Sequence, residues 1–480
     1  MREKSLFLLF SFIILTVFAQ VPPDTVWHPV EPSEIPQPEY LIPYNDVAHN
    51  IDVTRISDAA VFGFPDGVGE LRAPYSKTQA WNMDMTKIAI GFGSILNADD
   101  YSFYKTLNNA IPANGFNDGK WSHLDADIRY LCNNNNFYKI NIETEQLDLL
   151  YTFAVEEARI GPFEGNISAN DKYVVITDHI GFQAYLYDIE LNIIISEKTF
   201  DNNGFDWATI TPWSDYIAVS NNNTGVVELY DLDFNFLRNL SNNQQHADFG
   251  IDSFGNEVLV QVTPLSMTRL DNGEVTDLID EALVCGNYTF DPSIAGHISC
   301  RNFDFPGWAL VSTPNSEPCT NGIGFYTITE IFAIKLDGSG TIRHYGYSYS
   351  DYINYEGEAA ASFSPDGTKV IFSSSWNLFG TNDDNTLAYI AEYKNPLLID
   401  DNTIDLFNIY PNPTDGFVNF QTNTDKISFI EIYTILGNKV KTAVISNENN
   451  INISSLNNGI YFLKINLSDG NYQIKKIVKN

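Results

Sequence analysis

One hairpin decides the expected fold of this chain: Phe363-Ser364-Pro365-Asp366-Gly367-Thr368-Lys369-Val370-Ile371-Phe372. An aromatic residue is followed by an Asp-Gly turn, and an apolar strand resumes at Val370, seven residues after Phe363. Asp-Gly supplies the positive backbone angles that a tight hairpin turn needs. The stretch therefore predicts two antiparallel strands joined by a short turn.

The same seven-residue step recurs along the chain, each time from an aromatic or apolar anchor to the next strand. It joins Trp81 to Ile88, Trp121 to Ile128, Ile167 to Val174, Ile210 to Ile217 and Ile251 to Val258, and a stretched copy joins Ile298 to Trp308. With Phe363 there are seven anchors, spaced by 40, 46, 43, 41, 47 and 65 residues. Repeats of this length are typical of propeller blades.

We therefore predict an all-β chain, with a seven-bladed β-propeller over residues 20–399 followed by a small C-terminal β-sandwich. Residues 59–64 are a candidate N-terminal strand that closes the ring against the blade containing residues 387–393. Eight blades are the alternative if the 65-residue interval contains a weak copy around residues 325–335. The repeats, with Ser-Pro-Asp-Gly best seen after Phe363, resemble Tol-Pal type, WD-like propeller repeats.

The N-terminus reads as a targeting segment. Met1-Arg2-Glu3-Lys4 precedes an apolar run from Leu6 to Phe18, which is followed by a break at Gln20. About 13 apolar residues are too few for a membrane span, which needs roughly 20, so we predict a secretory signal peptide over residues 1–19. No later segment has 18 consecutive apolar residues, so we expect no transmembrane segment in the mature chain.

The last 80 residues predict short alternating strands, at 417–420, 427–433, 460–467 and 472–478, separated by Asn/Gly turns. Three motifs stand out in order: Ile409-Tyr410-Pro411-Asn412-Pro413, Ile432-Tyr433 with Leu436-Gly437, and Leu456-Asn457-Asn458-Gly459-Ile460-Tyr461. Over residues 402–480 they resemble the type A C-terminal sorting domain of the type IX secretion system. The resemblance implies handling by that machinery in a Bacteroidetes-type bacterium, and a secreted, extracellular or surface-attached protein.

Charge restricts the partners. The chain has 61 acidic and 27 basic side chains, a formal net charge of −34. Residues 401–480 hold seven of each kind, so the acidity belongs to the propeller region, where 53 acidic residues face 18 basic ones. Nucleic acid is excluded as a partner because phosphate binding needs a Lys/Arg surface. A polyanionic ligand would require basic groups gathered at one place.

Residues just ahead of each anchor lead into an innermost strand and should meet at the mouth of the central channel. They include Asn117, Asp118, Glu164, Asp206, His246, Asp248, His297, Glu356 and Glu358. Carboxylates and imidazoles in such a group can bind a cation or transfer protons. His246 and His297 are the main candidates, because adjacent blades present them and Arg301 follows His297 closely. The alternative is that His297 and Cys300 fill a loop interior and that His246 caps a turn through its ring nitrogens.

A tyrosine-dense stretch leads from His344 into the last clear blade. Tyr349, Tyr352 and Tyr355, with Glu358, are candidate substrate-binding residues, since tyrosines on a rim loop stack on sugars. The alternative is ordinary edge packing. With its His/Arg rim, this layout loosely resembles propeller-fold polysaccharide lyases, the ulvan and oligogalacturonate types. The resemblance implies His246 and His297 as base and acid, Arg301 as neutraliser of a uronate carboxylate, and a structural or catalytic divalent metal.

The four cysteines, Cys132, Cys285, Cys300 and Cys319, lack metal-finger spacing. Cys300 and Cys319 could form a disulfide in the irregular sixth repeat, and a zinc site on His297 and Cys300 has only two nameable ligands. Gly-x-Ser-x-Gly, phosphate-loop and His-Glu-x-x-His motifs are absent. We therefore expect a secreted propeller that engages an extracellular polysaccharide, by binding or as a lyase; the alternative is a non-catalytic module for another surface ligand or a protein.

Overall fold

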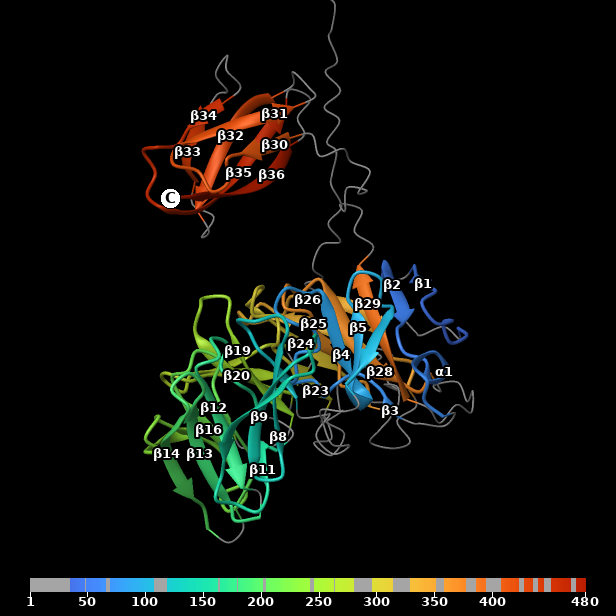
Figure 1. The fold of residues 1–480 in the computed structure, drawn as a ribbon, viewed down its shortest axis with the longest axis vertical. Coiled ribbons are helices and arrows are strands. Elements are labelled where there is room, and N and C mark those ends of the chain that lie inside the picture. Colours follow the sequence, from blue (N-terminus) through green and yellow to red (C-terminus); the bar gives the residue numbers. More distant parts are fainter. Residues whose placement is uncertain are drawn as a thin grey trace, which may run out of the picture. The chain divides into compact units, whose positions relative to one another are not determined.

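The computed structural model divides the chain into two compact units, Met1–Lys394 and Asn395–Asn480 (Figure 1). It describes residues 35–47, 49–65, 70–107, 119–162, 165–178, 180–201, 204–241, 246–262, 264–279, 296–313, 329–350, 358–376, 386–393, 407–422, 427–434, 439–443, 450–467 and 472–480. The predicted signal peptide lies outside the described residues. Among the described helices, none is long and apolar enough to cross a membrane.

The described part of the first unit contains seven antiparallel sheets in chain order, the blades of a β-propeller. Blade 1 comprises β4 (Lys87–Ile90), β5 (Ser94–Asn97) and β6 (Phe103–Thr106). Blade 2 comprises β7 (Lys120–Trp121), β8 (Ile128–Asn133), β9 (Asn136–Asn141) and β10 (Leu147–Thr152). Blade 3 comprises β11 (Ala158–Ile160), β12 (Tyr173–Asp178), β13 (Gln183–Asp188) and β14 (Ile193–Thr199).

The remaining blades follow the same order, with the first strand of each innermost. Blade 4 comprises β15 (Phe205–Ile210), β16 (Ile217–Asn221), β17 (Val226–Tyr230) and β18 (Phe236–Ser241). Blade 5 comprises β19 (Ala247–Ile251), β20 (Glu257–Gln261), β21 (Ser266–Arg269) and β22 (Val275–Asp277). Blade 6 comprises β23 (His297–Ser299), β24 (Trp308–Ser312), β25 (Glu330–Lys335) and β26 (Ile342–Tyr347). Blade 7 comprises β27 (Ser362–Phe363), β28 (Lys369–Ser374) and β29 (Thr386–Tyr393), completed by N-terminal strands.

The seven-residue step is a cross-strand pairing. Phe363 pairs directly with Val370, and Ile210 pairs with Ile217. Isolated bridges join Trp81 to Ile88 and Ile167 to Val174 in the same way. In these four copies the anchor therefore lies opposite the first apolar residue of the second strand, as predicted for a repeated hairpin. Trp121 pairs instead with Arg129 and Ile251 with Glu257, one residue away from the expected partners, and Ile298 pairs with Val311 rather than with Trp308.

The turn after Phe363 shows why this hairpin forms. The Ser364 hydroxyl donates to Asp366 at 2.7 Å and accepts from the Lys369 amide at 3.0 Å. Gly367 has φ 68°, which a residue without a Cβ adopts at no steric cost. The short polar side chains thus satisfy the turn's backbone donors and fix where the strand resumes.

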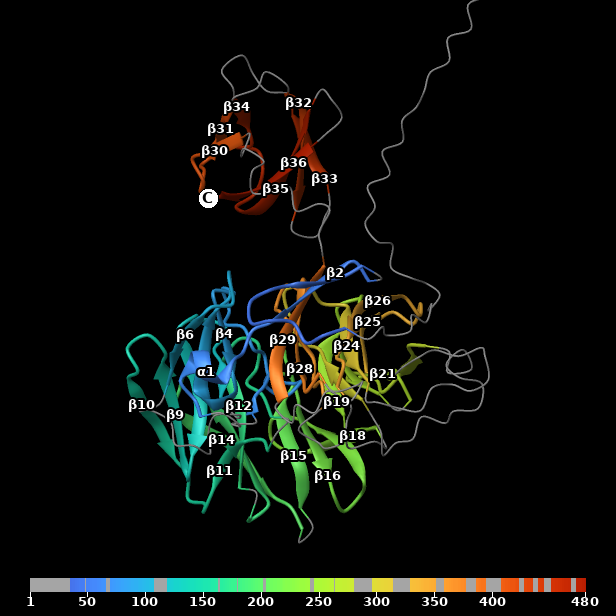
Figure 2. The same cartoon turned by 90° about the vertical axis from the view of Figure 1, so that its right-hand side faces the viewer.

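An N-terminal strand closes the ring, but it is not the predicted one. β2 (Ile51–Arg55) pairs antiparallel with β29 (Figure 2). β1 (Tyr44–Asp46) pairs with β2. The prediction of a strand at 59–64 was wrong, because Ala59–Phe62 form the short helix α1. Asp58 accepts from the Val61 amide at its start, and Gly63, at φ 77°, ends it. Further on, β3 (Glu70–Leu71) pairs parallel with β29.

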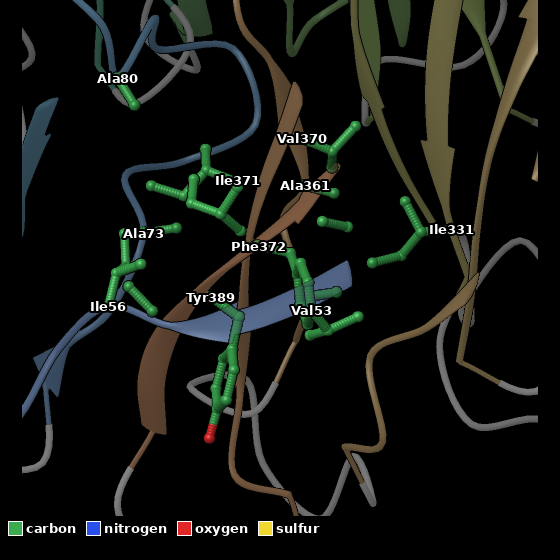
Figure 3. Packing of buried hydrophobic residues seen from close by; sticks show 14 of the residues in the cluster. Val53, Ile56, Ala73, Ala80, Ile331, Ala361, Val370, Ile371, Phe372 and Tyr389 are labelled. Atoms are coloured by element: carbon green, nitrogen blue, oxygen red, sulfur yellow. The ribbon is translucent and has the colours of Figure 1, made fainter. Parts of the chain in front are cut away.

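The apolar core runs through the closing blade into its neighbours. Val53 of β2, Phe372 of β28 and Tyr389 of β29 are buried in one cluster that also takes in Ile331 of blade 6 (Figure 3). The Phe372 and Tyr389 rings stack at 5.4 Å. Burial of such side chains contributes about 1.5–3 kcal/mol each, so the N-terminal strand is held by packing as well as by pairing.

In the residues that the structure describes between the anchors Ile298 and Phe363, there is one blade. Within residues 325–335, the described part forms β25, the third strand of blade 6, which pairs with β24 and β26. The alternative of an eighth blade at this place was therefore wrong.

The C-terminal unit is a β-sandwich of two antiparallel sheets. One contains β30 (Phe407–Tyr410), β31 (Phe417–Thr422) and β34 (Asn450–Asn452); the other contains β32 (Ile427–Thr434), β33 (Lys439–Ala443), β35 (Gly459–Leu467) and β36 (Tyr472–Lys479). All four predicted strands are present, and β30, β33 and β34 were not predicted. Val418, Ile432 and Leu463 belong to the single apolar cluster between the sheets.

Candidate functional site

Three of the predicted site residues meet at the start of the innermost strands of blades 5 to 7. His246 precedes β19, His297 begins β23, and Glu358 lies ahead of β27. The His246 and His297 rings are 5.0 Å apart in a T-shaped contact. His297 Nε2 bonds Glu358 Oε2. We call these residues, with Tyr75, the inner-rim cluster.

The pairing with Glu358 fixes the role of the His297 ring. A carboxylate facing Nε2 favours a proton on that nitrogen, so Nδ1 becomes the acceptor. His297 is only 3% exposed, and its Nδ1 has no hydrogen-bond partner. A buried ring nitrogen without a partner calls for an explanation, which a bound ligand group or water would give.

His246 is kept neutral. Burial, followed by the nearby His297 and Lys77, lowers the pKa of His246 to about 3. Its Nδ1 is also buried without a hydrogen-bond partner, and its backbone is left-handed at φ 56°. Two buried imidazole nitrogens of the inner-rim cluster thus lack a hydrogen-bond partner.

Sequence reasoning missed the segment 75–79, which crosses the central channel just ahead of Trp81. Asn166 of blade 3 donates to the Lys77 carbonyl at 2.9 Å, and Lys120 of blade 2 donates to the Thr78 hydroxyl at 2.6 Å. Gln79 donates to the Arg301 carbonyl at 2.8 Å and to the Phe363 carbonyl at 3.1 Å. The prediction considered only the residues ahead of the later anchors. The position of residues 75–79 just ahead of the anchor Trp81 was the signal that could have identified them.

Two side chains of this segment border the inner-rim cluster. The Tyr75 ring makes a T-shaped contact with His297 at 5.2 Å. The Lys77 ammonium is buried and lies 5.8 Å from the centroid of Tyr75 and 5.6 Å from that of Trp207. The half-buried phenol of Tyr75 and the buried ammonium of Lys77 therefore lie beside the two histidines.

Arg301 is not directed at this cluster. Its Nη2 donates to Asp248 Oδ1 at 2.6 Å and its Nε to Asp248 Oδ2 at 3.1 Å. Nη2 also donates to the Phe249 carbonyl at 2.8 Å, and Arg301 and Asp248 are both buried. The guanidinium charge is compensated inside the protein, so this geometry favours a structural role over binding of a substrate carboxylate.

The candidate tyrosines lie elsewhere or outside the described residues. Tyr349 is buried and stacks on Trp376 at 4.6 Å, within the core of the closing blade. It therefore offers its ring to Trp376 rather than to a sugar. Tyr352 and Tyr355 lie outside the described residues, as do Asn117, Asp118, Glu164 and Glu356.

The metal and disulfide hypotheses find no support in the described residues. No group of three His, Cys, Asp or Glu side chains among them is placed to hold a metal ion. Cys300 is a buried free thiol, and Cys319, its expected partner, lies outside the described part. Its backbone amide donates to Asp248 at 2.7 Å.

Comparisons with known proteins identify the C-terminal part of the chain. Residues 408–480 match the family described as "Secretion system C-terminal sorting domain". A solved structure described as "Crystal Structure of Mitotic Checkpoint Complex" is 12% identical, with a TM-score of 0.44, over 77% of this chain and 98% of that chain. A comparison with curated proteins found no match. The C-terminal unit is therefore a type IX secretion sorting domain, and the chain is a secreted or cell-surface propeller protein.

Proposed function

We propose that this exported propeller binds an extracellular glycan at the inner-rim cluster. The observation that carries the proposal is the meeting of His246, His297 and Glu358 from three consecutive blades, with two buried imidazole nitrogens that lack hydrogen-bond partners. Tyr75, His246 and Glu358 are half-buried, so one side of each can face a ligand. Hydroxyl groups of a sugar can satisfy such nitrogens while its apolar face packs on a phenol ring.

The proposed route to this ligand begins at the N-terminus. Residues 1–19 serve as a signal peptide that brings the chain to the periplasm of a Bacteroidetes-type bacterium, and the sorting domain then directs it outward. Tyr352 and Tyr355, which lie outside the described residues, remain proposed ligand contacts. Tyr349 and Arg301 support the fold around the site through Trp376 and Asp248.

A glycan array with the full mature chain tests binding, followed by calorimetry on any glycan retained. We expect His246→Asn and Tyr75→Leu each to weaken affinity at least tenfold, because each removes a group that faces the ligand. Asn tolerates the left-handed backbone at position 246. The control is Tyr349→Phe, which keeps the stacking on Trp376 and should bind normally. Absence of glycan binding, or equal affinity of all variants, would contradict the proposal.

A lyase is the second candidate, and the His297–Glu358 pair favours it. Glu358 leaves His297 Nδ1 as a proton acceptor, the arrangement a general base needs. In the proposed step, Nδ1 removes the C5 proton of a uronate, its electrons form the C4–C5 double bond, and the C4–O bond breaks. The leaving oxygen takes a proton from the Tyr75 hydroxyl. Lys77 is the cation beside this cluster that would offset the uronate charge.

A panel of uronate polysaccharides incubated with the mature chain tests this step through the ultraviolet absorbance of the unsaturated product. We expect His297→Ala and Glu358→Gln to lower the rate at least a hundredfold, since general base catalysis contributes about 10²–10⁴. Glycan binding without product would leave the binding proposal standing and overturn the lyase.

A further inference from the structure

We propose that the propeller face opposite the inner-rim cluster docks a positively charged protein segment that carries apolar side chains. This face is formed by the turns that join the innermost strand of each blade to the second strand. His246 precedes β19 and Phe254 follows it, while His297 begins β23 and Phe305 follows that strand. The two surfaces therefore lie at opposite ends of the same strands, and this inference is independent of the proposed function.

Large apolar side chains project from five of these seven turns. They are Met83, Leu124, Trp213, Phe254 and Phe305, and all are exposed. Phe254 is 76% exposed and Leu124 is 67% exposed, so neither is held there by the core. In blade 7 the corresponding turn carries Asp366, a usual turn residue. We call these five residues the turn rim.

Phe303 lies between opposite parts of this face. It belongs to the long turn of blade 6, yet its ring contacts His123 in the turn of blade 2 at 5.6 Å. The Arg301 guanidinium lies over the same ring at 5.0 Å. An aromatic ring thus bridges across the end of the channel, inside the turn rim.

Hydrogen bonds connect each blade's turn to the next blade and hold the rim in place. The Asn82 amide donates to the Ala126 carbonyl at 3.0 Å, and the His123 backbone donates to Asp171 at 2.8 Å. The remaining connections are Ala169 to Pro212, Trp213 to Glu257, Gly307 to Ile251, Asp304 to Pro365 and Lys369 to Tyr101. Since all seven junctions are bonded, the exposed tips are displayed on a fixed ring, which lowers the entropy cost of binding.

The charge of the turns identifies the occupant. They hold eight aspartates, of which Asp171 and Asp252 are buried and the other six are exposed or half-buried, against Lys172 and Arg301, and Arg301 is paired with Asp248. An acidic surface with aromatic tips suits a cationic segment with apolar side chains. A second copy of this chain, with a net charge of −34, would be repelled, and nucleic acid would be repelled for the same reason.

The test uses the full mature chain and a labelled synthetic peptide of alternating lysine and leucine, with binding followed by fluorescence anisotropy. We expect saturable binding that weakens with salt, and at least a tenfold loss in the triple variant Leu124→Ser, Trp213→Ser, Phe254→Ser. The control is Leu149→Ser, Ile195→Ser, Phe236→Ser, which removes exposed apolar residues (55%, 40% and 55% exposed) from outermost strands. It should bind like the wild type.

Four other results would overturn the proposal. A peptide of lysine and serine that binds equally well would show charge attraction alone, and equal losses in both triple variants would remove the role of the turn rim. Dimerisation in sedimentation velocity that the first triple variant abolishes would identify a second copy as the occupant. Binding of a soluble neutral β-glucan that needs the turn rim would identify a glycan instead.

Discussion

The two ends of the innermost strands differ in the kind of side chain they carry and in how that side chain is held. At the start of β19 and β23, His246 and His297 are polar and in mutual contact; His246 is half-buried and His297 is buried. After the same strands, Phe254 and Phe305 are apolar and exposed. Polar groups usually face water and apolar groups the core, so both ends reverse the usual preference. Such reversals mark surfaces that are kept for binding rather than for stability.

The largest expected effect comes from the ion pair between the two ends. In Asp248→Ala the buried Arg301 guanidinium loses its partner, which should lower the free energy of unfolding by about 3–5 kcal/mol. Urea denaturation followed by tryptophan fluorescence measures this change. Asp271→Ala is the control, because Asp271 binds Arg269 with the same fork at the surface and should show no measurable loss. If Asp248→Ala and Asp271→Ala lowered the free energy of unfolding equally, the Arg301 guanidinium would not be confined to the interior.

The next effect is the pH dependence of stability that His246 causes at the polar end of the innermost strands, where it meets His297. Its folded pKa, near 3, lies below the ordinary value of 6.5, so between these values the unfolded chain binds the proton that the folded chain excludes. The lowered pKa of His246 adds its full amount to the free energy of unfolding above about pH 6.5. This amount falls by at most about 1.4 kcal/mol for each unit by which the pH is lowered. We expect His246→Asn to flatten this slope, measured by denaturation from pH 7 to pH 4.

Trp213→Ala is the control for that measurement, because it alters the apolar end and removes no titratable group. Its slope should equal that of the wild type. A wild-type slope that survives in His246→Asn would show that His246 is protonated in the folded chain, and the neutral imidazole assumed in the proposed site would then be wrong.

Glu257 lies at the apolar end of the innermost strands, beside the turn rim. It gives stability the opposite pH dependence, over a narrower pH range. Burial raises the pKa of this carboxyl from 4.5 to about 7, against hydrogen bonds from the Trp213 amide and the Thr211 hydroxyl that lower it. The folded chain therefore holds a proton that the unfolded chain releases, and stability falls as the pH rises from about 4.5 to 7. Glu257→Gln should remove this fall. If Glu257→Gln were less stable at every pH, the hydrogen bond from the Trp213 amide would need the ionised carboxylate of Glu257.

The sequence predicted the blades because each depends on local chemistry, such as Ser364 and Asp366 within one turn. It also predicted the proximity of His246 and His297, since both precede innermost strands of adjacent blades. The helix at residues 59–62 was missed although Asp58 and Gly63, its cap residues, were visible. The pairing of Arg301 with Asp248 joins residues 53 apart in the chain, and no periodicity encodes which carboxylate a buried guanidinium meets.

The smallest expected effect is the most informative about the turn rim. Phe254→Ser removes an aromatic ring that is 76% exposed, so it forfeits little buried apolar area and should change the free energy of unfolding by less than about 0.5 kcal/mol. Phe249→Ser in β19, five residues earlier and 4% exposed, should cost several times more, because it opens a cavity against Trp207. Urea denaturation compares the two. If Phe254→Ser were as costly as Phe249→Ser, the turn-rim residue would be part of the fold, and its exposure would no longer argue for a partner. If Phe254→Ser changes the free energy of unfolding only slightly but loses peptide affinity, Phe254 serves binding rather than stability.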